Sequence, residues 1–289
     1  MTVTDTGLAE VMAAVDAAFV AGRPPTPPGA FKVGVDLGTA YTVVIALDED
    51  DRPLGAATAF ADVVRDGVVT DFVGAIDLVR RLKADVEART GLTLTAAHGA
   101  FPPGVPRAEV RAVAHVIEAA DMDCTGLVDE PTAANAVLGL RDGVVVDIGG
   151  GTTGIAVVAD GQVVHTADEP TGGTHLTLVV AGAHGIPFEQ AERLKTDPAA
   201  QPRLFPVVRP VMEKVAAIVA RNTTGYPVPT VHLVGGSAAF PGFADVVSDV
   251  TGLPTVVPVN PLFVTPLGIA RSAPARPVSS WERGAPPRG

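Results

Sequence analysis

Two glycine turns, each preceded by an aspartate, hold the residues best suited to chemistry in this 289-residue sequence. Asp36 and Asp147 each stand near the end of an apolar run and lead into a turn of small residues. Backbone N–H groups in such a turn can approach phosphate oxygens without interference from side chains. The hydroxyls of Thr39 and Thr152 add donors, and a carboxylate at a strand end can hold Mg²⁺, mostly through water. Singly, the first turn is more typical of a tight hairpin, whereas the three consecutive glycines after Ile148 are hard to explain by packing.

The two turns belong to a repeated unit, because Asp147 lies 111 residues after Asp36. Each copy contains an apolar strand, a small-residue turn with threonine, a second apolar strand and an acidic turn, followed by helices. A unit that occurs twice predicts two similar α/β domains facing each other across a cleft, where the opposed turns would clamp a polyphosphate. At least nine of the 31 glycines are expected to face this cleft. They are Gly38, Gly149, Gly150, Gly151, Gly154, Gly172, Gly173, Gly235 and Gly236.

Hydrophobic periodicity predicts the elements that must position these turns. Strands are expected in pairs over 31–50 and 143–164, and further along at 52–62, 93–102 and 127–128. Helices are expected over 8–20, 72–89, 106–120, 129–140, 188–195 and 207–223. A loop and helix are expected over 167–185, a strand, turn and helix over 230–252, and a proline-rich linker over 23–29.

Composition excludes several classes of protein. An apolar fraction of 47% and a mean hydropathy of +0.33 argue against disorder. No run approaches the 18 or so apolar residues that span a membrane, and a net charge of −11 argues against binding nucleic acid or anionic membrane surfaces. The single cysteine excludes an intrachain disulfide and fits a reducing cytoplasm. The six histidines lack metal-ligand spacing.

Five short motifs follow one another in order along residues 31–271. They are Asp36-Leu-Gly-Thr39, Glu130-Pro-Thr-Ala-Ala-Asn-Ala136, Asp147-Ile-Gly-Gly-Gly-Thr-Thr153, Leu233-Val-Gly-Gly-Ser237 and Pro266-Leu-Gly-Ile-Ala270. This order resembles the phosphate 1, connect 1, phosphate 2, adenosine and connect 2 motifs of the actin, sugar-kinase and DnaK-type chaperone ATPase superfamily. The resemblance implies an α/β actin-like ATPase fold, in which two duplicated ribonuclease-H-like domains surround a nucleotide cleft and the outer subdomains are reduced.

The sequence pattern and the resemblance together predict four parts along the chain. Residues 1–30 would be the amphipathic helix and its linker, and 31–142 the first actin-like domain. Residues 143–271 would be the second domain with most of the nucleotide-binding motifs, and its C-terminal helix could return to the first domain. Residues 272–289 would be a flexible tail, in which Trp281 could dock.

Within that superfamily the chain most resembles the EutJ proteins of ethanolamine-utilisation and related bacterial microcompartment operons. The segments that carry the resemblance are 61–69, 101–105, 129–136, 145–158, 171–182 and 262–270. The resemblance implies an ATP-binding, chaperone-like assembly or reactivation factor that acts by nucleotide-dependent domain closure. Its client would be a microcompartment enzyme or shell protein, and its location the bacterial cytoplasm, in association with the microcompartment. The oligomeric state stays open.

The resemblance also assigns roles within the cleft. Asp36 and Asp147 would hold Mg²⁺, and Glu130, Asp147 and Thr152 would form the catalytic set, with Glu130 orienting the attacking water. ATP or ADP would be bound by Gly38, Thr39, Ala40, Gly150, Gly151, Thr152, Thr153, Glu192, Lys195, Gly235, Gly236 and Ser237. Two assignments have alternatives: Glu130 could serve only as an acid at a helix N-terminus, and Glu192 and Lys195 could form an exposed i,i+3 ion pair.

Departures from the superfamily limit the expected activity. DnaK-type ATPases and MreB place a phosphate-binding lysine before the helix expected at 72–89, but that segment contains none here, and Lys83 on the helix is a poor substitute. Only eleven residues separate Lys195 from the helix expected at 207, where relatives insert a small sheet beside the adenine. We also expect no separate peptide-binding domain after residue 271, unlike in a DnaK-type chaperone. We therefore expect a weak ATPase at most, with a non-catalytic actin-like scaffold as the alternative and a small-molecule kinase as a third.

The N-terminal helix has two interpretations. Its apolar face is made by Leu8, Val11, Met12, Val15 and Phe19. That face could pack on the protein's own body. A short amphipathic helix on a proline-rich linker is also the form of the peptides that dock enzymes inside microcompartments, so the helix could instead bind a partner.

Overall fold

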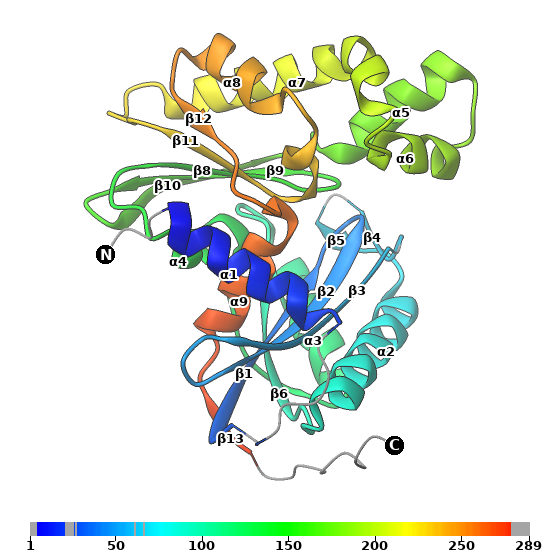
Figure 1. Ribbon diagram of the computed structural model, residues 1–289, viewed down its shortest axis with the longest axis vertical. Coiled ribbons are helices and arrows are strands. Elements are labelled where there is room, and N and C mark those ends of the chain that lie inside the picture. The colour runs from blue at the N-terminus through cyan, green and yellow to red at the C-terminus, as the bar shows by residue number, and fades with distance from the viewer. Residues whose placement is uncertain (1–4, 21–25, 27, 61, 66, 279–289) are drawn as a thin grey trace.

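Two mixed β-sheets with the same strand order form the two halves of the molecule, in a computed structural model that describes residues 5–20, 26, 28–60, 62–65 and 67–278 (Figure 1). The first sheet contains β1 (Ala30–Leu37), β2 (Tyr41–Asp48), β3 (Pro53–Phe60), β6 (Ala96–Phe101), β7 (Asp123–Asp129) and β13 (Arg276–Pro277). The second contains β8 (Gly143–Ile148), β9 (Thr153–Ala159), β10 (Gln162–Glu169), β11 (Val231–Val234) and β12 (Thr255–Val256).

The strand order confirms the duplicated unit. It runs β3-β2-β1-β6-β7 in the first sheet and β10-β9-β8-β11-β12 in the second. In each sheet three antiparallel strands, consecutive in the chain, are followed by two parallel ones. Asp36 pairs with Val43 and Asp147 with Gly154, so each aspartate lies one residue before the end of the first strand in its hairpin. The fold therefore places the two turns equivalently.

The first domain packs two helices against its sheet. They are α2 (Phe72–Thr90) and α3 (Arg107–Ala119). The Asp71 carboxylate caps α2 by accepting a hydrogen bond from the Gly74 N–H at 2.9 Å, and Gly91 ends the helix with a φ of 74°. Leu82 and Val86 of α2 and Ile117 of α3 are buried with strand residues in one core. A small hairpin of β4 (Val64–Arg65) and β5 (Val68–Val69) precedes α2.

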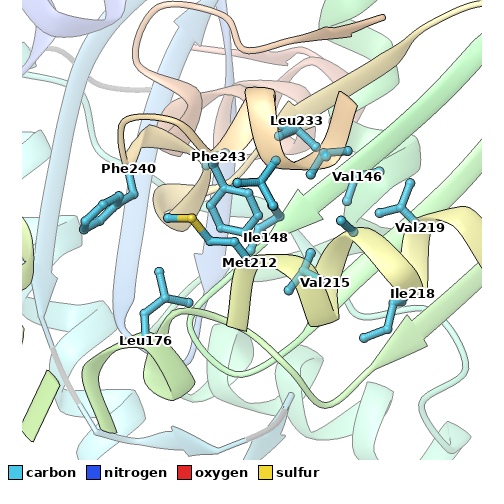
Figure 2. Close-up of a cluster of buried hydrophobic side chains, with 14 of the residues drawn as sticks. Val146, Ile148, Leu176, Met212, Val215, Ile218, Val219, Leu233, Phe240 and Phe243 are labelled. Atoms are coloured by element: carbon cyan, nitrogen blue, oxygen red, sulfur yellow. The ribbon is translucent and has the colours of Figure 1, made fainter. Parts of the chain in front are cut away.

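The second domain has a larger helical layer (Figure 1). It consists of α5 (Gly173–His184), α6 (Phe188–Thr196), α7 (Gln201–Thr223), η1 (Gly236–Ala239), α8 (Phe243–Thr251) and η2 (Pro261–Phe263). Figure 2 shows Met212 and Val215 of α7 directed at Phe243 and at Ile148 of β8, and all four side chains are fully buried. The prediction that this helix begins at 207 is wrong, because α7 begins at Gln201. Pro206 and Pro210 lie one turn apart and both are exposed, so the rings face solvent and the apolar stripe continues past them.

Two helices cross between the sheets and join the domains. α4 (Glu130–Leu138) follows β7, and α9 (Val264–Ser272) returns from the second domain to pack on β1 and α4. The close packing of α9 on α4 and β1 depends on two glycines. A Cβ atom at Gly268 would lie 1.8 Å from the Ala133 carbonyl oxygen, and one at Gly34 would lie 2.6 Å from the Ala270 nitrogen. The last helix therefore does reach the first domain.

The N-terminal helix α1 (Asp5–Ala18) lies on the protein's own body, across α9 and between the two sheets (Figure 1). Met12 and Val15 are fully buried in a cluster that also includes residues of β2, α4 and α9. The linker residues 21–25 and 27, and residues 279–289 with Trp281, lie outside the described residues. Within the segment expected to be a tail, Arg276 and Pro277 form β13, which pairs with the start of β1. Among the described helices none has the length and apolar character needed to cross a membrane.

Candidate functional site

A cleft of about 830 Å³ lies between the domains and is lined by both glycine turns. Its floor holds three acidic residues, Asp36, Glu130 and Asp147. The other predicted residues that line it are Gly38, Thr39, Ala40, Gly150, Gly151, Thr152, Glu192, Lys195, Gly235, Gly236 and Ser237. The structure thus brings together, from both domains and from five separate segments, nearly all the residues that the sequence motifs single out.

Backbone hydrogen bonds close the two turns. The Gly38 N–H donates to the Tyr41 carbonyl at 3.2 Å, and the Gly149 N–H donates to the Thr152 carbonyl at 3.0 Å. The turns lie against each other, since a Cβ atom at Gly150 would come within 2.9 Å of the Ala40 nitrogen. Only residues without bulk leave space for a ligand's anionic group beside these N–H groups.

The second turn is held from behind by α5 and η1. The N–H groups of Gly173 and Thr174 donate to the carbonyls of Gly149 at 2.9 Å and Gly150 at 2.7 Å, and Ser237 Oγ donates to the Gly149 carbonyl at 2.9 Å. Six of the nine glycines expected at the cleft line it, whereas Gly154, Gly172 and Gly173 do not. Of these three, Gly172 and Gly173 allow close packing behind the turn, because a Cβ atom at Gly172 would lie 2.7 Å from the Gly149 carbonyl oxygen.

The three acidic residues of the floor have raised pKa values, because desolvation disfavours their charged forms and neighbouring carboxylates repel one another. Burial, followed by repulsion from Asp147, raises the pKa of Asp36 to about 7. Burial raises the pKa of Asp147 to about 6, and a hydrogen bond from Thr265 opposes this shift. Burial and four neighbouring carboxylates, with Asp147 the strongest, raise the pKa of Glu130 well above its usual range. Such a group of acids favours either bound protons or a cation.

Thr265, which sequence reasoning missed, is part of this floor. Its Oγ1 donates to Asp147 Oδ2 at 2.5 Å, and its side chain is 3% exposed. The contact joins β8 to the second residue of α9, across 118 positions of sequence. No local pattern marks such a residue, although it stands one position before the motif that begins at Pro266.

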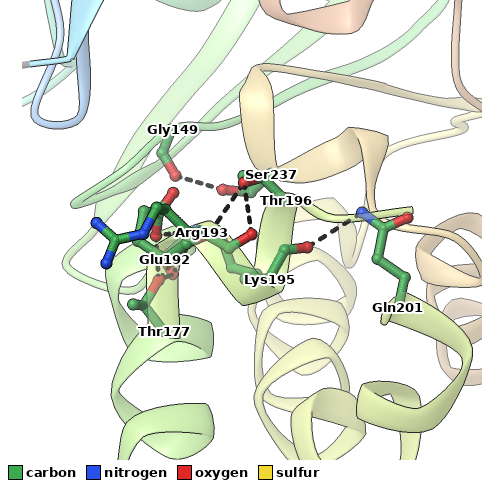
Figure 3. A network of polar contacts seen from close by, with 9 residues as sticks. Gly149, Thr177, Glu192, Arg193, Lys195, Thr196, Gln201 and Ser237 are labelled. Atoms are coloured by element: carbon green, nitrogen blue, oxygen red, sulfur yellow. Dashed lines mark hydrogen bonds and ion pairs between the residues drawn. The ribbon is translucent and has the colours of Figure 1, made fainter. Parts of the chain in front are cut away.

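Glu192 and Lys195 form a pair at the wall of the cleft (Figure 3). Lys195 Nζ lies 2.7 Å from Glu192 Oε2, and both side chains are nearly buried, at 12% and 11% exposed. Thr177 Oγ1 donates to Glu192 at 2.5 Å, and Lys195 donates to the Gly173 carbonyl at 3.3 Å. The i,i+3 spacing therefore does give an ion pair, but not the exposed one of the alternative interpretation. The pair ties α6 to α5 beside the second turn.

Thr153 does not line the cleft, in contrast to its predicted phosphate-binding role. Its side chain is fully buried, and its hydroxyl donates to the Thr171 carbonyl at 2.5 Å. The preceding residue, Thr152, does line the cleft and is 7% exposed. The difference follows from the strand that begins at Thr153, because successive side chains of a strand point to opposite faces.

Arg65 is a second residue of the cleft that sequence reasoning missed. It lies on β4, in the segment where a lysine was looked for, and its guanidinium is 3.5 Å from the Asp62 carboxylate. Lys83 does not line the cleft and pairs instead with Glu87 at 3.4 Å. In the described part of the chain, the only basic side chains that line the cleft are therefore those of Arg65, Lys195 and His175.

Comparison with known proteins decides the family. The ethanolamine utilization protein EutJ of Salmonella typhimurium is 44% identical over 246 residues, which cover 84% of this chain and 86% of that protein. EutJ of Escherichia coli is 43% identical over 242 residues, or 83% of this chain and 85% of the relative. The chain belongs to the EutJ family.

Solved structures agree with this assignment. The crystal structure of EutJ from Carboxydothermus hydrogenoformans superimposes with a TM-score of 0.86 and 46% identity, over 92% of this chain and 98% of the other. MreB5 of Spiroplasma citri bound to AMPPNP has a TM-score of 0.67 at 17% identity, over 85% and 95% of the two chains. The family model for the cell division protein FtsA matches residues 144–270, and the model for MreB/Mbl protein matches residues 58–181. The fold of this EutJ-family chain is therefore actin-like.

The residues of this cleft are compatible with a nucleotide and Mg²⁺. The small residues of the two turns line the cleft, where backbone N–H groups suit phosphate oxygens, and the clustered carboxylates would lose mutual repulsion near a cation. No group of three or more His, Cys, Asp or Glu side chains in the described ranges is arranged to hold a metal directly.

Proposed function

We propose that the protein is an ATP-binding, chaperone-like switch that assembles or reactivates an enzyme of a bacterial microcompartment through nucleotide-dependent domain closure. The observation that supports nucleotide binding is the convergence, on one cleft, of two glycine turns and three acids with raised pKa values, from both domains. A ligand that contacts both turns must favour the arrangement in which they lie together.

Three groups of residues would share the nucleotide. The N–H groups of 38–40 and 150–152 would bind the phosphates, and Mg²⁺, held through water by Asp36 and Asp147, would offset the combined negative charge. The Glu192–Lys195 pair and the turn at 235–237, which line the wall of the cleft, would contact the ribose and adenine. The Lys195 ammonium already pairs with the Glu192 carboxylate. The pair is therefore better suited to positioning the nucleotide than to a direct salt bridge with a phosphate.

Hydrolysis is expected to be weak or absent. Glu130 stands at the N-terminus of α4, and burial with four carboxylates nearby favours its protonated form. A protonated carboxyl can donate a hydrogen bond to water but cannot accept the proton that an attacking water must lose. Glu130 can therefore orient a water while being a poor general base, unless a cation lowers its pKa.

Thermal unfolding with added ligand tests the nucleotide part of the proposal. A ligand at 100 times its dissociation constant stabilises the folded state by about 2.7 kcal/mol. We expect millimolar ADP and ATP to raise Tm when Mg²⁺ is present, and to have little effect when it is chelated. Unchanged Tm values with both nucleotides and Mg²⁺ would contradict the proposal. Phosphate release equal to that of a protein-free blank would leave the switch intact and exclude catalysis.

The client part of the proposal rests on family membership, because the EutJ relatives are named ethanolamine utilization proteins. The test is reactivation of an inactivated ethanolamine-utilisation enzyme from the same organism, with Mg·ATP, Mg·ADP or no nucleotide. Recovery that depends on the nucleotide is the expected result. Recovery that is the same under all three conditions, or absent, would contradict a nucleotide-driven chaperone.

One observation favours a second candidate, a non-catalytic actin-like scaffold. Residues 61–71 contain no lysine, and Arg65 in that segment pairs with Asp62. A scaffold with vestigial nucleotide binding would need no cation there. Replacing Arg65 with Gln separates the two candidates: the switch predicts weaker ATP binding with ADP binding less affected, whereas the scaffold predicts no change in either.

A further inference from the structure

Residues 260–265 contact the cleft on one side and the N-terminal helix on the other. Asn260, Leu262, Phe263 and Thr265 line the cleft. Thr265 fixes one end of the segment to the acidic floor through its hydrogen bond to Asp147. A ligand in this part of the cleft would therefore lie next to a segment that is hydrogen-bonded to the acidic floor.

The same segment holds the C-terminal end of α1. Asn260 Nδ2 donates to a carboxylate oxygen of Asp16, and the ring of Phe19 lies 4.7 Å from that of Phe263. The Phe19 carbonyl also accepts a hydrogen bond from Arg89 Nη1 of α2 at 2.6 Å. Because α2 belongs to the first domain, this end of the helix is attached to both domains at once.

The apolar face of α1 lies across the connection between the domains (Figure 1). Its buried residues are clustered with Ile45 of the first sheet, with Val145 and Val234 of the second, and with Leu267 of the crossing helix α9. A rotation of one domain relative to the other would pull some of these contacts apart. The helix thus fits one particular arrangement of the domains.

We propose that α1 is a strap that seats fully only in this arrangement of the domains, and that residues 260–265 couple its seating to the occupancy of the cleft. The two sites are the cleft and the groove under α1, and the two states are the seated and the loosened helix. The identity of the cleft ligand rests on the proposed function, whereas the link between Asp147 and α1 does not.

The coupling has a definite sign. The strap is seated in the arrangement in which the two glycine turns lie against each other. A nucleotide gripped by both turns favours that same arrangement, so ligand and strap stabilise each other. Linkage then requires that nucleotide binding stabilises the seated form of α1. Loosening α1 must weaken nucleotide binding by the same factor.

The first experiment needs no nucleotide. Amide hydrogen exchange in residues 5–18 of the full chain is compared for wild type, Thr265→Val and Thr265→Ser. Loss of one hydrogen bond costs about 0.5–1.5 kcal/mol, so α1 in the valine variant is expected to exchange about 2- to 10-fold faster. The serine variant keeps the hydroxyl and is expected to match wild type. Equal exchange in all three chains would overturn the link.

The second experiment removes the contact at the other end of the segment. Asp16→Ala deletes the acceptor of Asn260 on an exposed face, and Glu10→Ala is the matched control on the same helix. With Mg·ADP as the probe, we expect slower exchange in α1 of wild type, and about fivefold weaker binding to the Asp16 variant alone. Nucleotide binding with unchanged or faster α1 exchange overturns the strap but leaves the proposed function in place. Absence of nucleotide binding overturns the proposed function. The first experiment then tests, without a nucleotide, whether the cleft floor and α1 are coupled.

Discussion

Asp36, Glu130 and Asp147 are acids whose protonation is set by burial and by one another rather than by a basic partner. Three acids this close together destabilise the protein when no ligand is bound, so neutral residues would be favoured there if stability alone mattered. The presence of these acids at the floor of a cleft lined with backbone N–H groups is therefore better explained by a ligand that carries a cation.

The pH dependence of stability follows from these acids. The pKa of Asp36 is raised to about 7 and that of Asp147 to about 6, against about 3.9 for an aspartate in an unfolded chain. Between these values the folded protein binds more protons than the unfolded chain, so its stability falls as the pH rises. We expect Tm, measured with EDTA present, to fall between about pH 5 and about pH 8, and Asp36→Asn to reduce that fall.

The control is Asp85→Asn on the exposed face of α2. This variant is expected to keep the wild-type pH profile. A wild-type Tm that rises over the same interval would contradict the assignment of raised pKa values to the floor.

Gly150 tests the contact between the turns. A Cβ atom there would meet both the nitrogen and the Cβ atom of Ala40 at 2.9 Å, so Gly150→Ala must push the turns apart. Overpacking of this kind costs about 1–3 kcal/mol, and we expect nucleotide affinity to fall about tenfold. The matched control is Gly182→Ala on α5, where an added Cβ meets nothing within 4 Å. Calorimetry should find equal affinities for the control and wild type, and equal losses in both variants would contradict the role of the turn.

At the scale of elements, sequence periodicity was sufficient where a segment carries its own signals. Helix α2 has a capping Asp71 and a terminal Gly91, and its bounds agree with the prediction to within one residue. Helix α7 disagrees by six residues, because prolines that would break an isolated helix are tolerated on a solvent-facing side. The pairing of β13 with β1 and the hydrogen bond of Thr265 depend on residues far apart in sequence, which no local pattern encodes.

The N-terminal helix is a structural part of the body. Met12 is fully buried in the cluster that joins the domains, and replacing a buried Met with Ala costs about 2–5 kcal/mol. Met12→Ala should therefore lower Tm by several degrees, whereas Ala13→Ser on the exposed side of the helix should not. If the two variants unfold at the same temperature, α1 does not contribute to the fold in solution and the interpretation as a partner-docking helix regains support.

The crossing of α9 over α4 depends on Gly268. A Cβ atom at this position would lie 1.8 Å from a backbone oxygen of Ala133, which cannot move without shifting α4. We expect Gly268→Ala to lower the free energy of unfolding by about 3 kcal/mol or more, measured by urea denaturation. A variant as stable as wild type would contradict the need for glycine where α9 crosses α4.

For the whole molecule, the duplicated sheets explain why so much of the cleft is predictable. Repetition places both glycine turns at equivalent strand ends, and two facing copies bring the turns to a common cleft. The net charge of −11 would not prevent a polyphosphate from binding there, because in the proposed function backbone N–H groups and a cation would bind it. The repeat does not predict the other residues at or near the cleft. Helix α1, Arg65 and Thr265 lie outside the two repeated strand–turn–strand segments.

Isothermal titration calorimetry of the full chain with ATP and with ADP, each with Mg²⁺, tests the central claim most directly. The account predicts that wild type binds both nucleotides with dissociation constants of about 1 mM or tighter. It also predicts that Asp147→Ala binds neither under the same conditions, because the floor loses one of the two acids that would hold the cation. No binding to wild type, or equal binding to wild type and to the variant, would contradict the account.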